Sequence, residues 1–177
     1  MTAPATDPAA ALDAATYRAI FRHHPAGVCV VTADAGNGPA ALTATSLTSL
    51  SLDPPLVSFA VAARASSWPT LRDAQTLVVH LLAAGQQDAA RHFATPGIDR
   101  FAPPTRWSRL PTGEPMLADP PVKLRCAVVE RLAVGDHTIV VAQPLESFRG
   151  ADRHDGLLYV DGGFHRLTAD SRLSESA

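Results

Sequence analysis

The sequence is poor in the residues that mark disulfide-rich and metal-binding proteins. Its 177 residues include only two cysteines, Cys29 and Cys126, which lie far apart in apolar runs. Two such cysteines form neither a disulfide framework nor a metal-binding knuckle, and the seven histidines show no ligand spacing. We therefore expect two buried free thiols and no metal site.

Long apolar runs and an excess of positive charge are also missing. No window of about 20 apolar residues occurs, so we expect no membrane span. No basic segment followed by an apolar stretch opens the chain, so we expect no secretion signal and a cytoplasmic protein. The net charge is -2, and Lys123 is the only lysine among 15 basic residues. This balance argues against general binding of nucleic acid, which needs a basic face.

Three motifs that would indicate common enzyme classes are absent. The sequence contains no P-loop, no Gly-x-Gly-x-x-Gly dinucleotide fingerprint and no Gly-x-Ser-x-Gly elbow. It also lacks the alternation of strands and long helices that builds a parallel sheet. An apolar share of 46% nevertheless supports a real core. We therefore predict a single, mostly β domain over residues 13–167, between flexible tails at 1–12 and 168–177.

Short β-branched apolar runs separated by turn residues predict the strands of this domain. Asp13 is positioned to cap a first helix ending near His23, with Tyr17, Ile20 and Phe21 on one face. Further short helices are expected at 67–74, where Ser67 would be the hydroxyl cap, and at 86–93. Residues 96–113 are expected to form a loop. Strands are expected at 27–33, 40–45, 56–62, 77–82, 122–134, 137–148, 157–160 and 164–167. These six to eight strands with few, short helices predict an antiparallel barrel, closed or sandwich-like.

The most informative stretch is a run of small hydroxyl residues. Six hydroxyls occur in the nine residues from Thr43 to Ser51, alternating with small or apolar side chains. In a strand, this alternation sends one set of side chains into the core and the other outward. Small side chains leave backbone N–H groups accessible and let a flat polar ring such as a flavin approach closely. The same pattern also fits an ordinary strand edge that tolerates serine and threonine.

Two further segments carry candidate polar groups. In Arg64-Ala65-Ser66-Ser67, a strand ends and a helix begins, which offers N–H donors, hydroxyls and a positive charge to a phosphate. A plain helix cap beside a solvated arginine is the alternative. In Gly135-Asp136-His137, a tight turn places His137 at the start of a strand. Its imidazole could contact a nicotinamide or supply a proton, or it could be an ordinary surface histidine.

Taken in order, these segments resemble the flavin reductase-like family, the FMN-binding split-barrel reductases of two-component monooxygenases. The resemblance runs from Pro25 to Tyr159. Residues 43–55 match the family's Thr-Ala-x-Ser-Phe-x-Ser-Val-Ser-x-x-Pro-Pro stretch, with Thr45 in place of a frequent asparagine and Leu47 in place of phenylalanine. Other matches are Ser66-Ser67, Phe93-Ala94, Asp99-Arg100-Phe101, Cys126 and Gly135-Asp136-His137. A third departure is His80, where the family often has asparagine.

The resemblance implies a mostly β, Greek-key-like split barrel that acts as an NAD(P)H:flavin oxidoreductase. FMN or FAD would be the flavin, and NADH or NADPH the co-substrate, with hydride passing between stacked rings. It also implies a homodimer with flavin near its interface, and a partner monooxygenase that receives reduced flavin. His137 would be the catalytic residue and, with Asp136, would contact the nicotinamide. The implied flavin-binding residues are Thr43, Ala44, Thr45, Ser46, Ser49, Ser51, Arg64, Ser66, Ser67, Arg100 and Phe101.

Two other functions remain open from the sequence. A split barrel that only holds FMN, as a redox sensor or carrier, would share the flavin-binding segments. A related flavin-dependent oxidase acting on a small substrate would share them as well. Turnover of nicotinamide separates the reductase from both.

Overall fold

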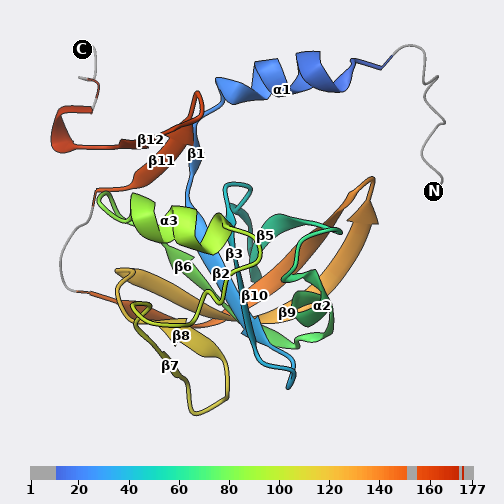
Figure 1. Ribbon diagram of the computed structural model, residues 1–177, viewed down its shortest axis with the longest axis vertical. Coiled ribbons are helices and arrows are strands. Elements are labelled where there is room, and N and C mark those ends of the chain that lie inside the picture. The colour runs from blue at the N-terminus through green and yellow to red at the C-terminus, as the bar shows by residue number, and fades with distance from the viewer. Residues whose placement is uncertain (1–10, 151–154, 172, 174–177) are drawn as a thin grey trace.

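The computed structural model describes residues 11–150, 155–171 and 173 (Figure 1). The helices are α1 (Ala14–Arg22), α2 (Trp68–Asp73) and α3 (Gln87–Ala94), followed near the end by a 3-10 turn at Ala169–Ser171. The strands are β1 (Ala26–Gly27), β2 (Cys29–Asp34), β3 (Pro39–Ala44), β4 (Thr48–Leu52), β5 (Pro55–Ala62), β6 (Thr76–Leu81), β7 (Trp107–Arg109), β8 (Pro115–Leu117), β9 (Val122–Val134), β10 (His137–Arg149), β11 (Leu157–Val160) and β12 (Gly163–Arg166).

Seven strands form the main sheet, which curls into an incomplete barrel. Its order is β3-β2-β6-β9-β10-β5-β4, and every neighbouring pair is antiparallel. The two edge strands, β3 and β4, are joined directly by residues 45–47. Within that connection the Ser46 hydroxyl accepts a hydrogen bond from the Ala60 amide at 2.9 Å. The predicted mostly β, antiparallel barrel is confirmed.

Turn residues set the register of the two main hairpins. Asp34 Oδ1 accepts hydrogen bonds from the amides of Gly36 and Gly38, which closes the β2–β3 hairpin. Gly135, with a φ of 59°, lies in the β9–β10 turn, where Val134 faces His137. Because positive φ values favour glycine, the sequence pattern located both hairpins correctly.

Two apolar cores hold the fold together. Alternate residues of the main strands fill the barrel interior, with Phe59, Leu77 and Val140 at its centre. A second core packs the other side of β2 against α3, where Phe93 meets Phe101 and Leu157. Cys29 and Cys126 are free and buried in the first core, as expected. Burial raises the pKa of each thiol to about 12.

The first helix stands apart from this body (Figure 1). Asp13 caps it as predicted, accepting hydrogen bonds from the amides of Ala15 and Thr16. None of the helix residues is buried. Within the described part of the chain, no helix is both long and apolar enough to cross a membrane. The predicted tails lie largely outside the described residues, so their boundaries stay predictions.

Three expectations about local structure are wrong. The described residues form twelve strands rather than six to eight, because several strands are only two to five residues long. The presumed loop over 96–113 contains β7, which pairs with β8. The hydroxyl of Ser67 does not cap α2, since this residue has helical backbone angles and makes no side-chain cap bond.

The hydroxyl run is also not one alternating strand. It covers the end of β3, the connection 45–47 and most of β4. On β4 the first three residues, Thr48 to Leu50, are all exposed, so no alternate set enters the core. The reason is that β4 is an edge strand that pairs only with β5.

Candidate functional site

A cavity of about 620 Å³ opens where β3, β5 and the start of β10 meet the segment before α2 and the end of α3. Ligand sites in proteins commonly enclose about 300–1,000 Å³. Its lining residues are Leu42, Thr43, Ala44, Thr45, Ser46, Ala60, Val61, Ala62, Arg64, Ala65, Ser66, Ser67, Phe93, Ala94, Pro96, Arg100 and His137. Segments far apart in the sequence therefore converge on one space.

Small side chains make the walls of this cavity. Ala60 and Ala62 face away from the barrel interior, because they alternate along β5 with Phe59 and Val61, which point into the core. Ala44 from β3 and Ala94 from α3 add further short side chains. The Thr43 hydroxyl donates to the Ala90 carbonyl at 2.7 Å, which ties α3 to β3. A flat ring can therefore approach the backbone closely from this side.

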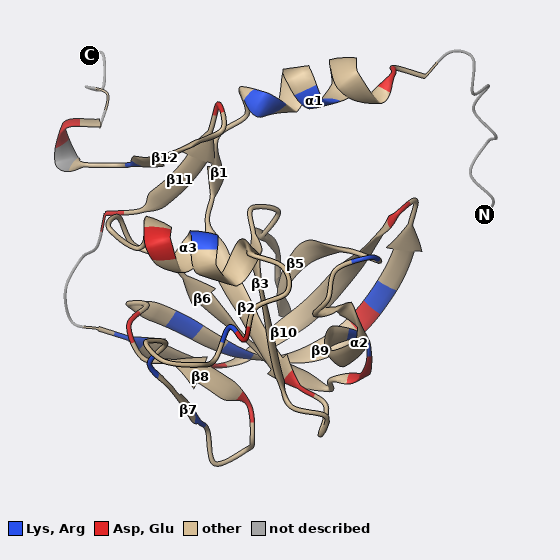
Figure 2. Cartoon of the chain, viewed as in Figure 1, with Lys and Arg blue, Asp and Glu red and all other residues tan. Residues whose placement is uncertain are grey.

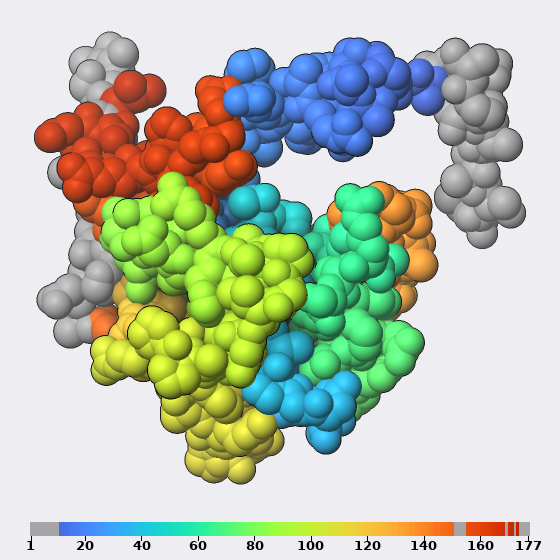
Figure 3. Space-filling model, viewed as in Figure 1, coloured from blue at the N-terminus to red at the C-terminus, as the bar shows by residue number. Residues whose placement is uncertain are grey.

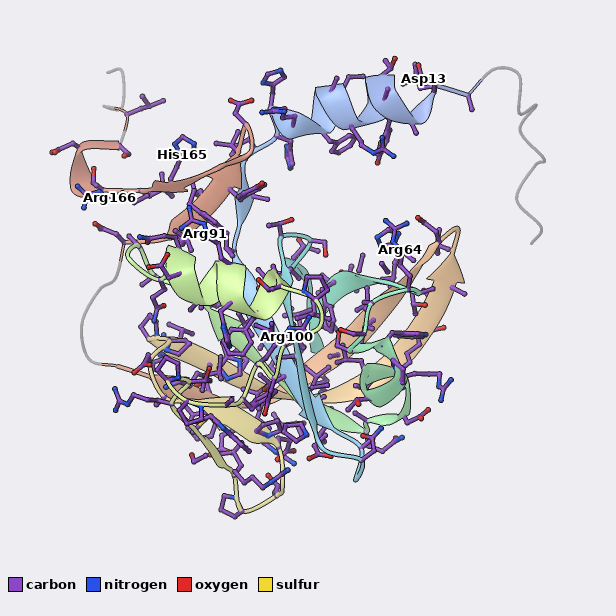
Figure 4. The ribbon with its side chains drawn as sticks, viewed as in Figure 1. Asp13, Arg64, Arg91, Arg100, His165 and Arg166 are labelled. Carbon is purple, nitrogen blue, oxygen red and sulfur yellow. The ribbon has the colours of Figure 1, made fainter. Side chains whose placement is uncertain are left out.

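Arg100 and the serine pair, Ser66 and Ser67, form the polar end of the cavity. Figure 4 labels Arg100, which lies near the middle of the molecule, next to α3 in this view. Arg100 donates from Nη1 to the Ser66 hydroxyl at 3.2 Å. Its Nε atom is buried and has no hydrogen-bond partner among the described residues. Burial lowers the pKa of this guanidinium, yet arginine keeps its charge at any physiological pH. Arg100 therefore places a positive charge at this end of the cavity, and its Nε–H group is not used by another described residue.

Arg64 and the β9–β10 turn form the opposite rim. The Ala63 amide donates to the Asp136 carbonyl at 3.0 Å, which holds the Arg64 segment against the turn. His137 Nδ1 donates to Asp136 Oδ1 at 2.7 Å. This hydrogen bond, followed by the charges of His137 and Arg64, lowers the pKa of Asp136. With Nδ1 engaged, the His137 ring is oriented and its Nε2 stays available.

Most of the sequence-predicted site residues come together in this cavity. Thr43, Ala44, Thr45, Ser46, Arg64, Ser66, Ser67, Arg100 and His137 all line it. Asp136 reaches it through His137. Ser49 and Ser51 lie on β4 and do not line it, because the chain turns away after Ser46. Phe101 is buried behind Arg100, where its ring packs on Trp107.

Three residues that line the 620 Å³ cavity were not predicted from the sequence: Ala60, Ala62 and Pro96. Ala60 and Ala62 lie in a strand whose apolar character indicated only a core position. Their alternation with Phe59 and Val61 was the available signal, because period-two spacing sends alternate residues to opposite faces. Pro96 gave no signal, since only the fold brings the segment after α3 to the cavity.

A second, larger cavity of about 810 Å³ lies under α1. Arg18, Phe21 and Arg22 line it from the helix, and residues 45–48 line it from the body. The two cavities share Thr45 and Ser46. The space between α1 and the body is open in the space-filling view (Figure 3).

Comparison with known proteins gives a consistent result. Residues 21–168 match the family model described as flavin reductase like domain. The chain is 45% identical over 158 residues to an NADH:FMN oxidoreductase of Rhodococcus qingshengii, covering 88% of this chain and 82% of that protein.

Two solved structures agree with this match. One is the NADH:FAD oxidoreductase SgcE6 of Streptomyces globisporus in complex with NAD and FAD fragments. It is 36% identical, has a TM-score of 0.83, and the alignment covers 96% of this chain and 100% of that chain. The other is BorF, the flavin reductase component of a bacterial two-component tryptophan halogenase. It is 36% identical, with a TM-score of 0.79 and coverage of 88% and 98%.

Proposed function

Since the chain belongs to the flavin reductase-like domain family, we propose that it is an NAD(P)H:flavin oxidoreductase that reduces FMN or FAD in the 620 Å³ cavity. The observation that carries this proposal is that the candidate polar groups of separate segments meet in one cavity. Arg100 with the serine pair, the small-residue wall and His137 come from separate segments and line a single cavity.

The residues present fit a phosphorylated flavin. A buried Arg100 Nε without a partner is suited to a charged acceptor, which a phosphate supplies. The alanine wall leaves room for a flat ring, and the cavity volume lies within the range of small-molecule sites. A flavin bound here would supply an acceptor for the hydride that leaves the nicotinamide.

The roles of the protein groups follow from their places. Arg100, Ser66 and Ser67 hold the phosphate, and Arg64 adds positive charge at the rim. Thr43 positions α3 through its bond to Ala90, while the segment from Ala44 to Ser46 supports the ring edge. We do not extend the proposal to Ser49, Ser51 or Phe101, which lie away from the cavity.

His137 acts at the rim of the cavity that lies opposite Arg100 and the serine pair. Its Nδ1 is held by Asp136, so its Nε2 can donate to or accept from a nicotinamide at the open rim. The main task of the protein is to hold the two rings in contact, because hydride transfer needs reacting atoms about 3–3.5 Å apart. His137 is therefore the residue that orients the co-substrate.

We also infer how the product is used. A reductase of this kind would pass reduced flavin to a partner monooxygenase, and BorF, a similar chain, is the reductase component of a two-component system. We further propose a homodimer. The cytoplasmic location expected from the sequence stays a prediction.

The decisive experiment follows oxidation of NADH and of NADPH by absorbance, with and without added FMN or FAD. A saturable, flavin-dependent rate is expected with at least one nicotinamide. Saturable flavin binding without nicotinamide oxidation would leave only a flavin-holding protein. Failure to bind either flavin would remove the proposal.

A further inference from the structure

The segment that carries Arg100 lies between α3 and β7, where the chain forms neither helix nor strand. Side chains bond to its backbone next to this arginine. Asp99 Oδ1 accepts a hydrogen bond from the Phe101 amide at 2.9 Å, and Trp107 Nε1 donates to the Phe101 carbonyl at 2.9 Å. Where no helix or sheet supplies partners, backbone groups bond to side chains or water instead. The position of Arg100 therefore depends on the side chains that hold this segment.

The backbone carbonyl of Arg100 itself is held by two side chains. Thr105 Oγ1 donates to this oxygen at 2.9 Å, and His92 Nε2 lies 3.0 Å from it. A carbonyl oxygen only accepts hydrogen bonds, so the ring nitrogen that faces it carries the hydrogen and donates. The Thr105 hydroxyl and His92 Nε2 are also within 3.2 Å of each other. We call His92 and Thr105 the carbonyl clamp, because together they use both lone pairs of one oxygen.

We propose that His92 and Thr105 are positioning residues, which fix the backbone of Arg100 so that its guanidinium meets the phosphate of the flavin. This inference rests on the proposed function. Neither residue of the carbonyl clamp lines the 620 Å³ cavity, so each acts on the flavin only through Arg100. The clamp therefore strengthens the binding of a phosphorylated flavin and contributes to the binding of neither the flavin ring nor the nicotinamide.

The charges near Arg100 support a backbone clamp rather than an ion pair as the means of positioning. Within the described part of the chain, its guanidinium forms no ion pair. The two acidic residues that precede it most closely are engaged elsewhere. Asp99 accepts from the Phe101 amide, and Asp88 pairs with Arg91 at 3.0 Å on α3, where Figure 2 shows both charges. A guanidinium that is placed without a carboxylate keeps its charge available for a phosphate.

The helix α3 gives the carbonyl clamp a fixed base. Ala90 and Phe93 are buried in the second core, and the Ala90 carbonyl accepts from the Thr43 hydroxyl at 2.7 Å. The His92 ring packs edge-on against Phe93, with centroids 5.2 Å apart, which restricts its orientation. His92 and Thr105 line a separate cavity of about 330 Å³. Substituting either one therefore leaves the lining residues of the 620 Å³ cavity unchanged.

The first test needs no flavin. Hydrogen exchange of the full chain, followed by mass spectrometry, reports on the hydrogen-bonded amides of Phe101 and Thr105. His92→Ala should speed exchange in peptides covering 99–106 by roughly 3- to 10-fold, with the β9–β10 hairpin unchanged. His92→Gln should restore slow exchange, because its amide nitrogen lies as many bonds from Cα as Nε2 does in histidine. Equal exchange in the wild type and His92→Ala would overturn the clamp.

The second test titrates FMN and riboflavin, which has no phosphate. His92→Ala and Thr105→Val should each raise the dissociation constant of FMN roughly 3- to 10-fold and leave that of riboflavin within about twofold. Thr95→Val is the matched control. It also removes a hydroxyl bond to a backbone carbonyl, that of Arg91 at 2.8 Å, but lines neither cavity. Equal losses for the two flavins, or a similar loss in Thr95→Val, would contradict positioning of the phosphate-binding group.

A double-mutant cycle then tests whether His92 acts through Arg100. In a chain that already carries Arg100→Ala, adding His92→Ala should change the dissociation constant of FMN by less than about twofold, because no guanidinium is left to position. Additive losses would show that His92 acts by another route and would overturn the inference. A chain that shows the expected exchange but binds neither flavin would contradict the proposed function. A chain that binds FMN equally well with and without His92 would contradict this inference alone.

Discussion

Arg100 donates from Nη1 to the Ser66 hydroxyl at 3.2 Å, while the Nε of the same guanidinium is buried without a partner among the described residues. A buried donor left unpaired costs about 1–3 kcal/mol, and more when it is charged. In the proposed site, the phosphate of the flavin would supply the acceptor that this Nε lacks.

Replacing Arg100 by Ala should weaken binding of FMN much more than binding of riboflavin, which has no phosphate. Hydrogen bonds to charged groups contribute about 1.5–3 kcal/mol, so the FMN dissociation constant should rise roughly 10- to 100-fold. Arg72→Ala is a matched control, because Arg72 lies on α2, is exposed and, among the described residues, forms an ion pair with Asp73 alone. Equal losses for the two flavins would place Arg100 at the ring rather than the phosphate.

Replacing His137 by Ala should separate the two substrates. The variant loses the group held towards the rim by Asp136, but keeps Arg100 and the serine pair. We expect a raised KM for the nicotinamide and an unchanged dissociation constant for FMN, measured by steady-state kinetics and by flavin titration. Asp136→Asn should give a smaller effect of the same sign, because a neutral amide oxygen still accepts from the ring but holds it less strongly than a carboxylate does. A loss of flavin affinity in His137→Ala would contradict this division of roles.

Period-two patterns and turn glycines account for what the sequence predicted well. The β9–β10 hairpin was located almost to the residue, because both strands are long, apolar and separated by Gly135-Asp136. β7 and β8 were missed because each is three residues long and lies among prolines and polar residues. The pairing of β7 with β8 depends on packing against the second core, to which Trp107 and Leu117 contribute. The local sequence pattern does not indicate this packing.

The candidate site shows the same division. The segments rich in small polar residues were recognisable one by one, but only the barrel closure decides which of them meet. The chain leaves β3 at Ala44 and Ser46 bonds to Ala60, so the first half of the hydroxyl run enters the cavity and the second half does not. The amphipathic pattern of α1 was likewise recognisable from the sequence. The position of α1 away from the barrel was not.

His80 links three strands and should make the fold sensitive to acid. Its Nδ1 donates to the Val30 carbonyl at 3.1 Å, and its Nε2 accepts from the Leu117 amide at 3.0 Å. Burial lowers its pKa from 6.5 to about 3. Below pH 6.5, His80 therefore binds a proton in the unfolded chain but stays neutral in the folded chain. Stability should fall as the pH drops from 6.5 towards 3, by at most about 1.4 kcal/mol per pH unit.

Two substitutions of His80 separate its charge from its hydrogen bonds. His80→Asn can still donate and accept but cannot titrate, so its denaturant midpoint should lose the slope between pH 6.5 and the range in which carboxylates titrate. His80→Leu leaves two buried backbone groups unpaired and should lose about 2–4 kcal/mol at neutral pH. An acid slope in His80→Asn as steep as in the wild type would assign the effect to other groups.

The ion pair of Arg125 and Glu114 is another largely buried polar element, and we expect it to affect stability rather than activity. Arg125 Nε donates to Glu114 Oε1 at 2.7 Å, and the side chains are 17% and 2% exposed. Burial pushes the pKa of Glu114 up, but hydrogen bonds from Thr112, Thr76 and Arg125 outweigh burial and lower it. Its contribution is therefore complete above the ordinary carboxyl pKa near 4.5 and is lost as the pH falls through the folded value.

Arg125→Met should cost roughly 3–5 kcal/mol in denaturant unfolding, because it strands a buried carboxylate. Adding Glu114→Leu should restore much of this loss, since the apolar pair leaves no uncompensated charge. Neither residue lines the 620 Å³ cavity, so the double variant should keep its flavin affinity. If it unfolds as readily as the single variant, the hydrogen bonds that Glu114 receives from Thr112 and Thr76 matter more than its ion pair.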